Sequence, residues 1–149
     1  MTFSKLPTVD ILIFLIGNLV NILISAIMIS RTSSWKKFEF YSGLIIVTMA
    51  IPLAACVYLN FIENRGVWTV ILPLFLIVYC LIELIFDYIF KSNFRETNLL
   101  WPYLLVFYLA LMGMIGYAFL LGKPFGFITL STYFLSLFAT RYSYTRVGH

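Results

Sequence analysis

Five long apolar segments, separated by short polar ones, account for most of this chain of 149 residues. A helix needs about 20 consecutive apolar residues to cross the hydrocarbon core of a bilayer. Hydrophobic residues make up 62% of the chain and charged residues 11%, and the mean hydropathy is +1.01. A soluble domain of this size has too little interior to bury so many apolar side chains. The sequence therefore predicts an all-α integral membrane protein, a single domain folded as a five-helix transmembrane bundle.

The predicted helices are connected by short loops. Their expected bounds are about 9–29, 41–62, 67–90, 99–121 and 124–140. The last is the shortest and the most polar. Pro52 lies inside the second helix and predicts a kink, because proline lacks a backbone N–H and clashes with the preceding turn. Short connections also predict that consecutive helices are antiparallel neighbours.

The basic residues outside these helices predict an orientation. An odd number of crossings puts seven Lys and Arg residues on the side of the C-terminus and three on the side of the N-terminus. Because cytoplasmic loops carry the excess of Lys and Arg, we expect the N-terminus outside and the C-terminus in the cytoplasm. Trp35, Trp68 and Trp101 each fall near a predicted helix boundary, which is typical of an aromatic belt. We expect a prokaryotic cytoplasmic membrane, with membrane lipids as partners.

Two acidic residues in the third predicted helix need an explanation, because charge inside a membrane is costly. Glu83 and Asp87 are four residues apart and share a helix face with Tyr79. At a rise of about 1.5 Å per residue, Glu83 lies roughly 12 Å and Asp87 roughly 6 Å from the cytoplasmic helix end. Asp87 is expected to pair with Lys91. Glu83 is too deep for that pairing, so it is either a neutral interhelical hydrogen-bonding group or part of a ligand, ion or proton site.

Polar side chains also recur on the first and fifth predicted helices. Asn18, Asn21 and Ser25 share one face of the first helix, and Thr and Ser residues recur at helical spacing through 129–140. Amides that face lipid are unfavourable, so both polar faces are expected to point inwards, toward the third helix. They either form ordinary interhelical hydrogen bonds or line a polar pocket around Glu83.

The sequence lacks the residues of several common sites. The only histidine is His149, which argues against a histidine-held haem or an ordinary histidine-based zinc site within one chain. Cys56 and Cys80 lie in apolar runs without a C-x-x-C motif and are expected to be buried thiols. A net charge of +4, dispersed among loops, does not indicate nucleic acid. We therefore expect no cofactor, metal or nucleic-acid partner.

These features favour one function over two alternatives. The leading hypothesis is a non-enzymatic membrane protein that binds or transports a small solute, ion or lipid at a site formed by Glu83, Asp87, Tyr79, Asn18 and Asn21. Transport is expected to require a homo-oligomer. The first alternative is an accessory or scaffold subunit whose polar faces contact a partner membrane protein. The second is a lipid-modifying enzyme at the cytoplasmic interface, with Asp87 as its acid or base.

Overall fold

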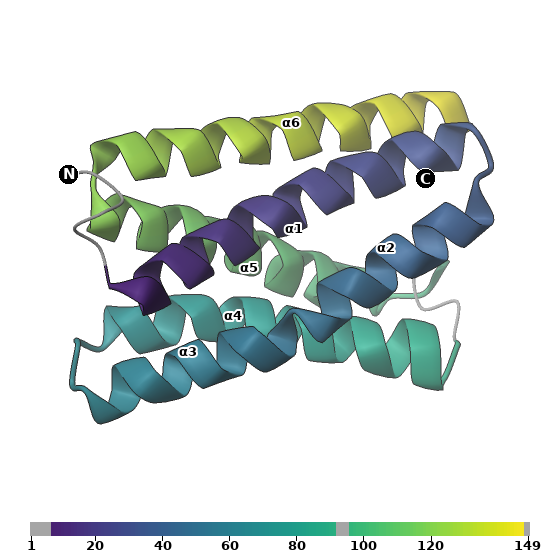
Figure 1. The fold of residues 1–149 in the computed structure, drawn as a ribbon. Helices are drawn as coiled ribbons and strands as arrows, with labels where there is room; N and C mark the ends of the chain where they lie inside the picture. Colours follow the sequence, from purple (N-terminus) through teal and green to yellow (C-terminus); the bar gives the residue numbers. More distant parts are fainter. Residues whose placement is uncertain (1–6, 92–95, 148–149) are drawn as a thin grey trace.

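The computed structural model describes residues 7–91 and 96–147, and these residues form helices that run along a shared long direction (Figure 1). The elements in chain order are α1 (Thr8–Thr32), α2 (Lys36–Thr48), α3 (Ala50–Ile62), α4 (Trp68–Glu83), the π-helix η2 (Leu84–Ile89), α5 (Leu100–Leu121) and α6 (Lys123–Val147). No strand occurs in the described ranges. The prediction of an all-helical bundle is confirmed.

Four helical segments of the described chain are long and apolar enough to cross a membrane. They are Thr8–Thr32, Lys36–Ile62, Trp68–Ile89 and Leu100–Leu121, and they correspond to the first four predicted spans. The fifth predicted span corresponds to α6, which extends to Val147 and is less apolar than the others. A membrane crossing by α6 therefore stays a prediction.

The second predicted helix is divided at Met49 into α2 and α3. Pro52 explains the break, because it offers no N–H to the carbonyl group of Thr48, four residues earlier. Just before the break, the thiol of Cys80 on α4 donates a hydrogen bond of 3.4 Å to the carbonyl oxygen of Ile46. Figure 1 shows that α3 continues from α2 with a change of direction.

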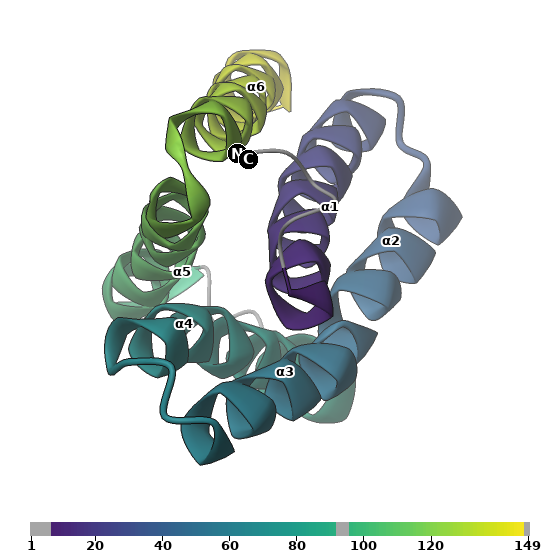
Figure 2. The ribbon, with the colours of Figure 1, turned by 60° about the vertical axis from the view of Figure 1, so that its left-hand side comes forward.

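Helix α1 packs against α2, α3, α5 and α6 (Figure 2). Ile13 and Val20 on α1 have no exposed surface. The α1 residues Asn18 and Asn21 each bond to a residue 111 positions later on α6, so α1 and α6 are parallel. The start of α1 and the end of α6 therefore lie at opposite ends of the bundle.

The two ends of the bundle are named here after one residue each. The Arg31 end holds the last residues of α1, η2 and α6 and the first residues of α2 and α5. The Asp10 end holds the start of α1, the connection between α3 and α4, and the turn between α5 and α6. Between the two ends, large apolar side chains such as Ile51 and Phe138 are exposed on the outer surface. An apolar outer surface of this extent is suited to lipid rather than water.

Candidate functional site: a cavity lined by Glu83

A cavity of about 770 Å³ opens at the Arg31 end of the bundle and is lined by α1, α2, α4, η2, α5 and α6. Its lining side chains change in character along the helices. Ile24, Ile46 and Phe107, which lie farther from the helix ends, make the lining apolar there. Charged side chains such as Lys36 and Glu96 lie closer to the Arg31 end. The cavity therefore combines an apolar interior with a charged entrance.

Glu83 is held at the wall of this cavity by two tyrosines. Its Oε1 accepts a hydrogen bond of 2.9 Å from the hydroxyl of Tyr79, one turn earlier on α4. The same oxygen accepts a second hydrogen bond from the hydroxyl of Tyr103 on α5. These two hydrogen bonds partly replace the hydrogen bonds to water that a carboxyl group loses on burial. The arrangement places an acidic group at a defined position and links α4 to α5.

Several aromatic rings line the same cavity as this carboxyl group. The ring centroids of Tyr79 and Tyr103 are 6.0 Å apart, and that of Phe107 is 5.4 Å from Tyr79. From another side of the cavity, Phe40 on α2 and Tyr88 on η2 bring two more rings, with centroids 5.3 Å apart. The faces of aromatic rings carry partial negative charge. The lining of the cavity therefore combines a carboxyl group with several aromatic rings.

Asp87 and Tyr88 belong to the π-helix η2 rather than to a continuous α-helix. A π-helical turn shifts every following side chain relative to α-helical spacing. Lys91, beyond η2, has a positive φ of 50°. The α-helical geometry expected around Asp87 is therefore replaced by a π-helical turn, although Glu83 and Asp87 both line the cavity. The pairing of Asp87 with Lys91 stays a prediction.

Helices α2 and η2 contact each other at the cavity. The hydroxyl of Tyr88 donates a hydrogen bond of 2.9 Å to the carbonyl oxygen of Phe40. The hydroxyl lies over Gly43, where the Cβ of any larger residue would collide with it. Gly43 thus allows η2 to approach α2 closely, and this close approach positions the ring of Tyr88 at the cavity.

Of the residues predicted to form the site, the structure brings Glu83, Asp87 and Tyr79 together at the cavity. Asn18 and Asn21 lie elsewhere, because their amides contact α6. The Nδ2 atom of Asn18 donates to Thr129 Oγ1 at 3.0 Å, and that of Asn21 donates to Thr132 Oγ1 at 3.0 Å. Thr132 Oγ1 also lies 2.9 Å from Asn18 Oδ1. The polar faces of α1 and α6 therefore face each other and form interhelical hydrogen bonds, the first of the two expected alternatives. The placement of Asn18 and Asn21 in the site around Glu83 is wrong.

A second polar cluster lies at the Asp10 end. Asp10 is 3% exposed, and its Oδ1 and Oδ2 accept hydrogen bonds from Arg65 at 2.9 and 2.6 Å. The hydroxyl of Tyr117 donates to Asp10 Oδ1 at 2.6 Å. Asn60 Nδ2 donates to that hydroxyl oxygen at 3.1 Å, while Asn60 Oδ1 accepts from Arg65 at 2.7 Å. The hydrogen bond to Asp10, partly opposed by burial, raises the pKa of Arg65, so the guanidinium stays charged.

Asn60 also compensates for a proline in α4. Pro73 has no N–H to donate to the carbonyl group of Thr69, four residues earlier. The amide Nδ2 of Asn60 donates a hydrogen bond of 3.1 Å to that carbonyl oxygen instead. Backbone polar groups inside a membrane need such internal partners. The cluster of Asp10, Asn60, Arg65 and Tyr117 therefore joins α1, α3, α4 and α5.

Sequence reasoning missed both this cluster and Tyr103. Asp10, in the first turn of α1, was a visible signal, because it is an acidic residue next to a long apolar run. Its partners lie 55 and 107 residues away, at separations that carry no local pattern.

Comparison with known proteins gives no match: no protein-family model, curated protein or solved structure corresponds to this chain.

Proposed function

We propose that this chain crosses the cytoplasmic membrane five times and binds a small solute in the cavity at its Arg31 end, with Glu83 as the principal polar contact. The observation that carries the proposal is the position of Glu83, whose carboxyl group is held by Tyr79 and Tyr103 at the wall of an open cavity. Ligand sites commonly have volumes of about 300–1,000 Å³ and a few convergent polar groups in an apolar lining. The cavity volume of about 770 Å³ falls within this range.

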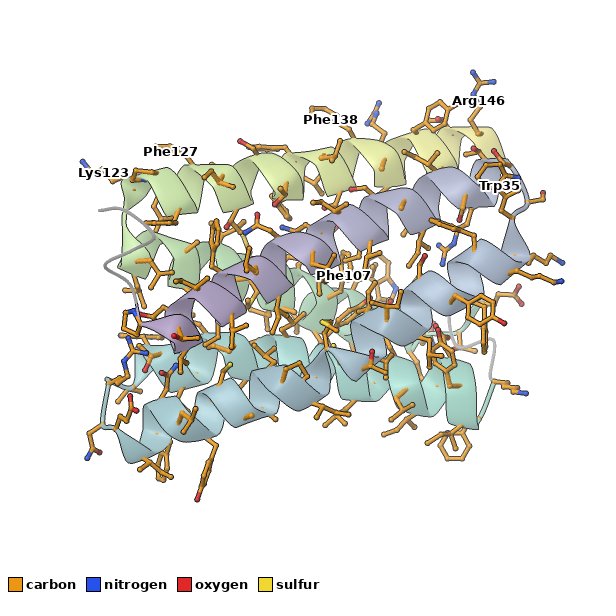
Figure 3. All side chains as sticks on the ribbon, viewed as in Figure 1. Trp35, Phe107, Lys123, Phe127, Phe138 and Arg146 are labelled. Carbon is orange, nitrogen blue, oxygen red and sulfur yellow. The ribbon has the colours of Figure 1, made fainter. Side chains whose placement is uncertain are left out.

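The packing of α6 supports a fifth crossing. Its polar residues Thr129 and Thr132 bond to α1, so they lower the hydropathy of α6 without facing lipid. Its outward side chains include Phe127 and Phe138, which are 58% and 69% exposed (Figure 3). Because α6 lies parallel to α1 over most of its length (Figure 1), it shares the membrane depth of α1. A helix with an apolar outer face and a polar inner face suits a bundle within a bilayer.

The distribution of charge supports the proposed orientation. Most of the described Lys and Arg residues lie at the Arg31 end, namely Arg31, Lys36, Lys37, Lys91, Arg141 and Arg146, whereas Arg65 and Lys123 lie at the Asp10 end. Since basic residues accumulate on the cytoplasmic side, the Arg31 end and its cavity are assigned to the cytoplasm.

The pairing of α1 with α6 favours this function over a scaffold role. The accessory-subunit hypothesis needs polar helix faces that are available to another membrane protein. The polar residues Asn18 and Asn21 instead bond to Thr129 and Thr132 within the chain.

Ligand-induced stabilisation of the purified protein tests the proposal. The unfolding temperature is measured with a panel of small cationic, anionic and neutral solutes. A solute that binds only the folded protein raises this temperature as its concentration increases. We expect such a solute for the natural chain and for Glu63→Gln, in which an exposed carboxylate at the Asp10 end is replaced. Glu83→Gln should lose the response. If no solute of any charge stabilises the protein, or if Glu83→Gln responds fully, the proposal is wrong.

A further inference from the structure

We propose that the turn between α1 and α2 binds the phosphate-bearing headgroups of anionic phospholipids in the surrounding bilayer. The residues concerned line an open hollow of about 460 Å³ and are named here the Lys36 patch, namely Ser34, Trp35, Lys36, Lys37 and Phe38. All five are exposed. The proposal concerns a surface of the bundle and does not depend on solute binding beside Glu83.

The Lys36 patch joins two segments that are long and apolar enough to cross a membrane, Thr8–Thr32 and Lys36–Ile62. Trp35 is 64% exposed and Phe38 is 44% exposed, and their ring centroids are 6.4 Å apart. An exposed tryptophan at the end of a spanning helix is typical of the membrane–water interface, where the indole ring lies among the lipid headgroups. The two rings therefore place the neighbouring lysines at headgroup depth.

Lys36 and Lys37 carry positive charges that have no carboxylate partner among the described residues. All six acidic side chains of the chain lie within those residues, so the remaining segments add no further acidic side chain. The nearest carboxylate in the sequence is that of Glu39, and it is engaged by Arg31, whose Nε lies 2.7 Å from Glu39 Oε1. The two lysines are therefore available to an external anion.

A phospholipid fits the Lys36 patch better than a soluble anion does. A lysine side chain extends its apolar stem along the hydrocarbon boundary and keeps its ammonium group at the headgroups. Each basic residue near an anionic membrane surface strengthens binding by a factor of about five. The exposed rings of Trp35 and Phe38 contact the apolar part of a lipid, whereas a free phosphate gains nothing from them. Arg146, at the same end of the bundle as Trp35, adds positive charge nearby (Figure 3).

Quenching of Trp35 fluorescence by brominated lipid tests the proposal. The full chain has three tryptophans, so the variant Trp68→Phe, Trp101→Phe retains Trp35 alone. It is placed in nanodiscs of phosphatidylcholine with a minority of phosphatidylglycerol, and the bromine is carried by one lipid or by the other. We expect phosphatidylglycerol to be bound beside Trp35 about fivefold or more tightly than phosphatidylcholine. Equal binding of the two lipids would overturn the proposal.

Trp68 provides a matched control at the Asp10 end. It is 62% exposed, close to the value for Trp35, and the nearby Arg65 is already paired with Asp10. A chain that retains only Trp68 should show no preference between the two lipids. The same preference at Trp35 and Trp68 would show that anionic lipid is not selected by the Lys36 patch.

Substitution of the lysines locates the binding. Lys36→Gln with Lys37→Gln should lower the preference at Trp35 by about fivefold or more, whereas Lys123→Gln, an exposed lysine at the Asp10 end, should leave it unchanged. Size-exclusion chromatography checks that each variant is folded, and the single lysine variants serve as the test if the double variant is not. A preference that survives the loss of both lysines would contradict the proposal.

Two additions to the buffer identify the interaction. Salt at about 1 M should reduce the preference at Trp35, because it shortens the Debye length to about 3 Å. A preference that is insensitive to salt would exclude pairing between the lysines and lipid phosphate. Free glycerol phosphate at millimolar concentration should not displace the lipid. If it does, the Lys36 patch binds a soluble phosphate and the assignment to lipid is wrong.

Discussion

The carboxylate of Asp10 and the guanidinium of Arg65 form a bidentate ion pair, in which each carboxylate oxygen lies within 2.9 Å of a guanidinium nitrogen. The two residues are 55 positions apart in the sequence. The side chain of Asp10 is 5% exposed and that of Arg65 is 22% exposed. The pair therefore joins α1 to the connection between α3 and α4 at one end of the bundle, with limited access to water. Removing one partner leaves the other charge without its compensating group.

Asp10→Asn is expected to destabilise the folded protein by about 2–3 kcal/mol, because Arg65 loses its counter-ion in a partly buried position. The value lies at the low end of the range for buried pairs, since water still reaches Arg65. Chemical unfolding in detergent micelles measures the difference. Glu39→Gln, which breaks the more exposed ion pair with Arg31, is the matched control and should cost about 1 kcal/mol or less. Equal costs for the two variants would contradict the structural role of Asp10.

Asn60→Ala should cost about 1–3 kcal/mol, because the carbonyl group of Thr69 and the hydroxyl of Tyr117 lose a buried partner. The cost should fall in a Pro73→Ala background, where residue 73 regains an N–H for the Thr69 carbonyl group. A double-mutant cycle of Asn60→Ala and Pro73→Ala measures this coupling, expected at about 0.5–1.5 kcal/mol. Additive effects would show that Asn60 does not compensate for the proline.

Gly43→Ala should have opposite effects in two backgrounds. In the natural chain, the added methyl group collides with the hydroxyl of Tyr88 and disturbs its bond to Phe40, at an expected cost of about 1 kcal/mol. In a Tyr88→Phe background the collision is removed, and alanine is expected to stabilise the helix by about 0.5–1 kcal/mol relative to glycine. Thermal unfolding of the four proteins measures whether Gly43→Ala stabilises or destabilises the protein in each background. A change in the same direction in both backgrounds would contradict the close contact between Gly43 and Tyr88.

Thr132→Val should weaken the packing of α6 on α1 without changing solute binding. The substitution removes a hydroxyl that bonds to Asn18 and Asn21, and interhelical hydrogen bonds in membranes contribute about 0.6–1.7 kcal/mol. Ser131→Ala is the control, because the exposed hydroxyl of Ser131 bonds only within α6, to Phe127, in the described interactions. Unfolding and the stabilisation of the protein by a bound solute are measured together. If Thr132→Val weakened solute binding as much as Glu83→Gln, Asn18 and Asn21 would have to contribute to the binding site.

Labelling of introduced cysteines tests the orientation. Ser33→Cys and Glu63→Cys are placed separately in a Cys56→Ser, Cys80→Ser background, since both positions are exposed at opposite ends of the bundle. A maleimide that does not cross membranes should label Glu63→Cys in intact bacterial cells, whereas Ser33→Cys should require permeabilised cells. The reverse pattern would invert the orientation, and labelling of both in intact cells would exclude the assigned sidedness.

Hydropathy and helical periodicity determined the parts of this structure that depend on local sequence. Four apolar segments became four helical segments of spanning length, the second divided into α2 and α3. The four-residue spacing of Tyr79 and Glu83 placed the two side chains on one helix face, where they form a hydrogen bond. Pro52 marked the division between α2 and α3, because the loss of a backbone N–H acts within one turn.

Only the tertiary structure decided which polar groups meet across helices. Tyr103 reaches Glu83 from α5, and Asn18 pairs with Thr129 rather than with the Glu83 region. Tyr117 joins Asp10 from 107 residues away. Such pairings depend on the rotation of each helix about its axis and on the packing of its neighbours, which the period of one helix does not specify. The cavity follows from the same packing, because its lining residues come together only where five helices and a π-helical turn meet around Glu83.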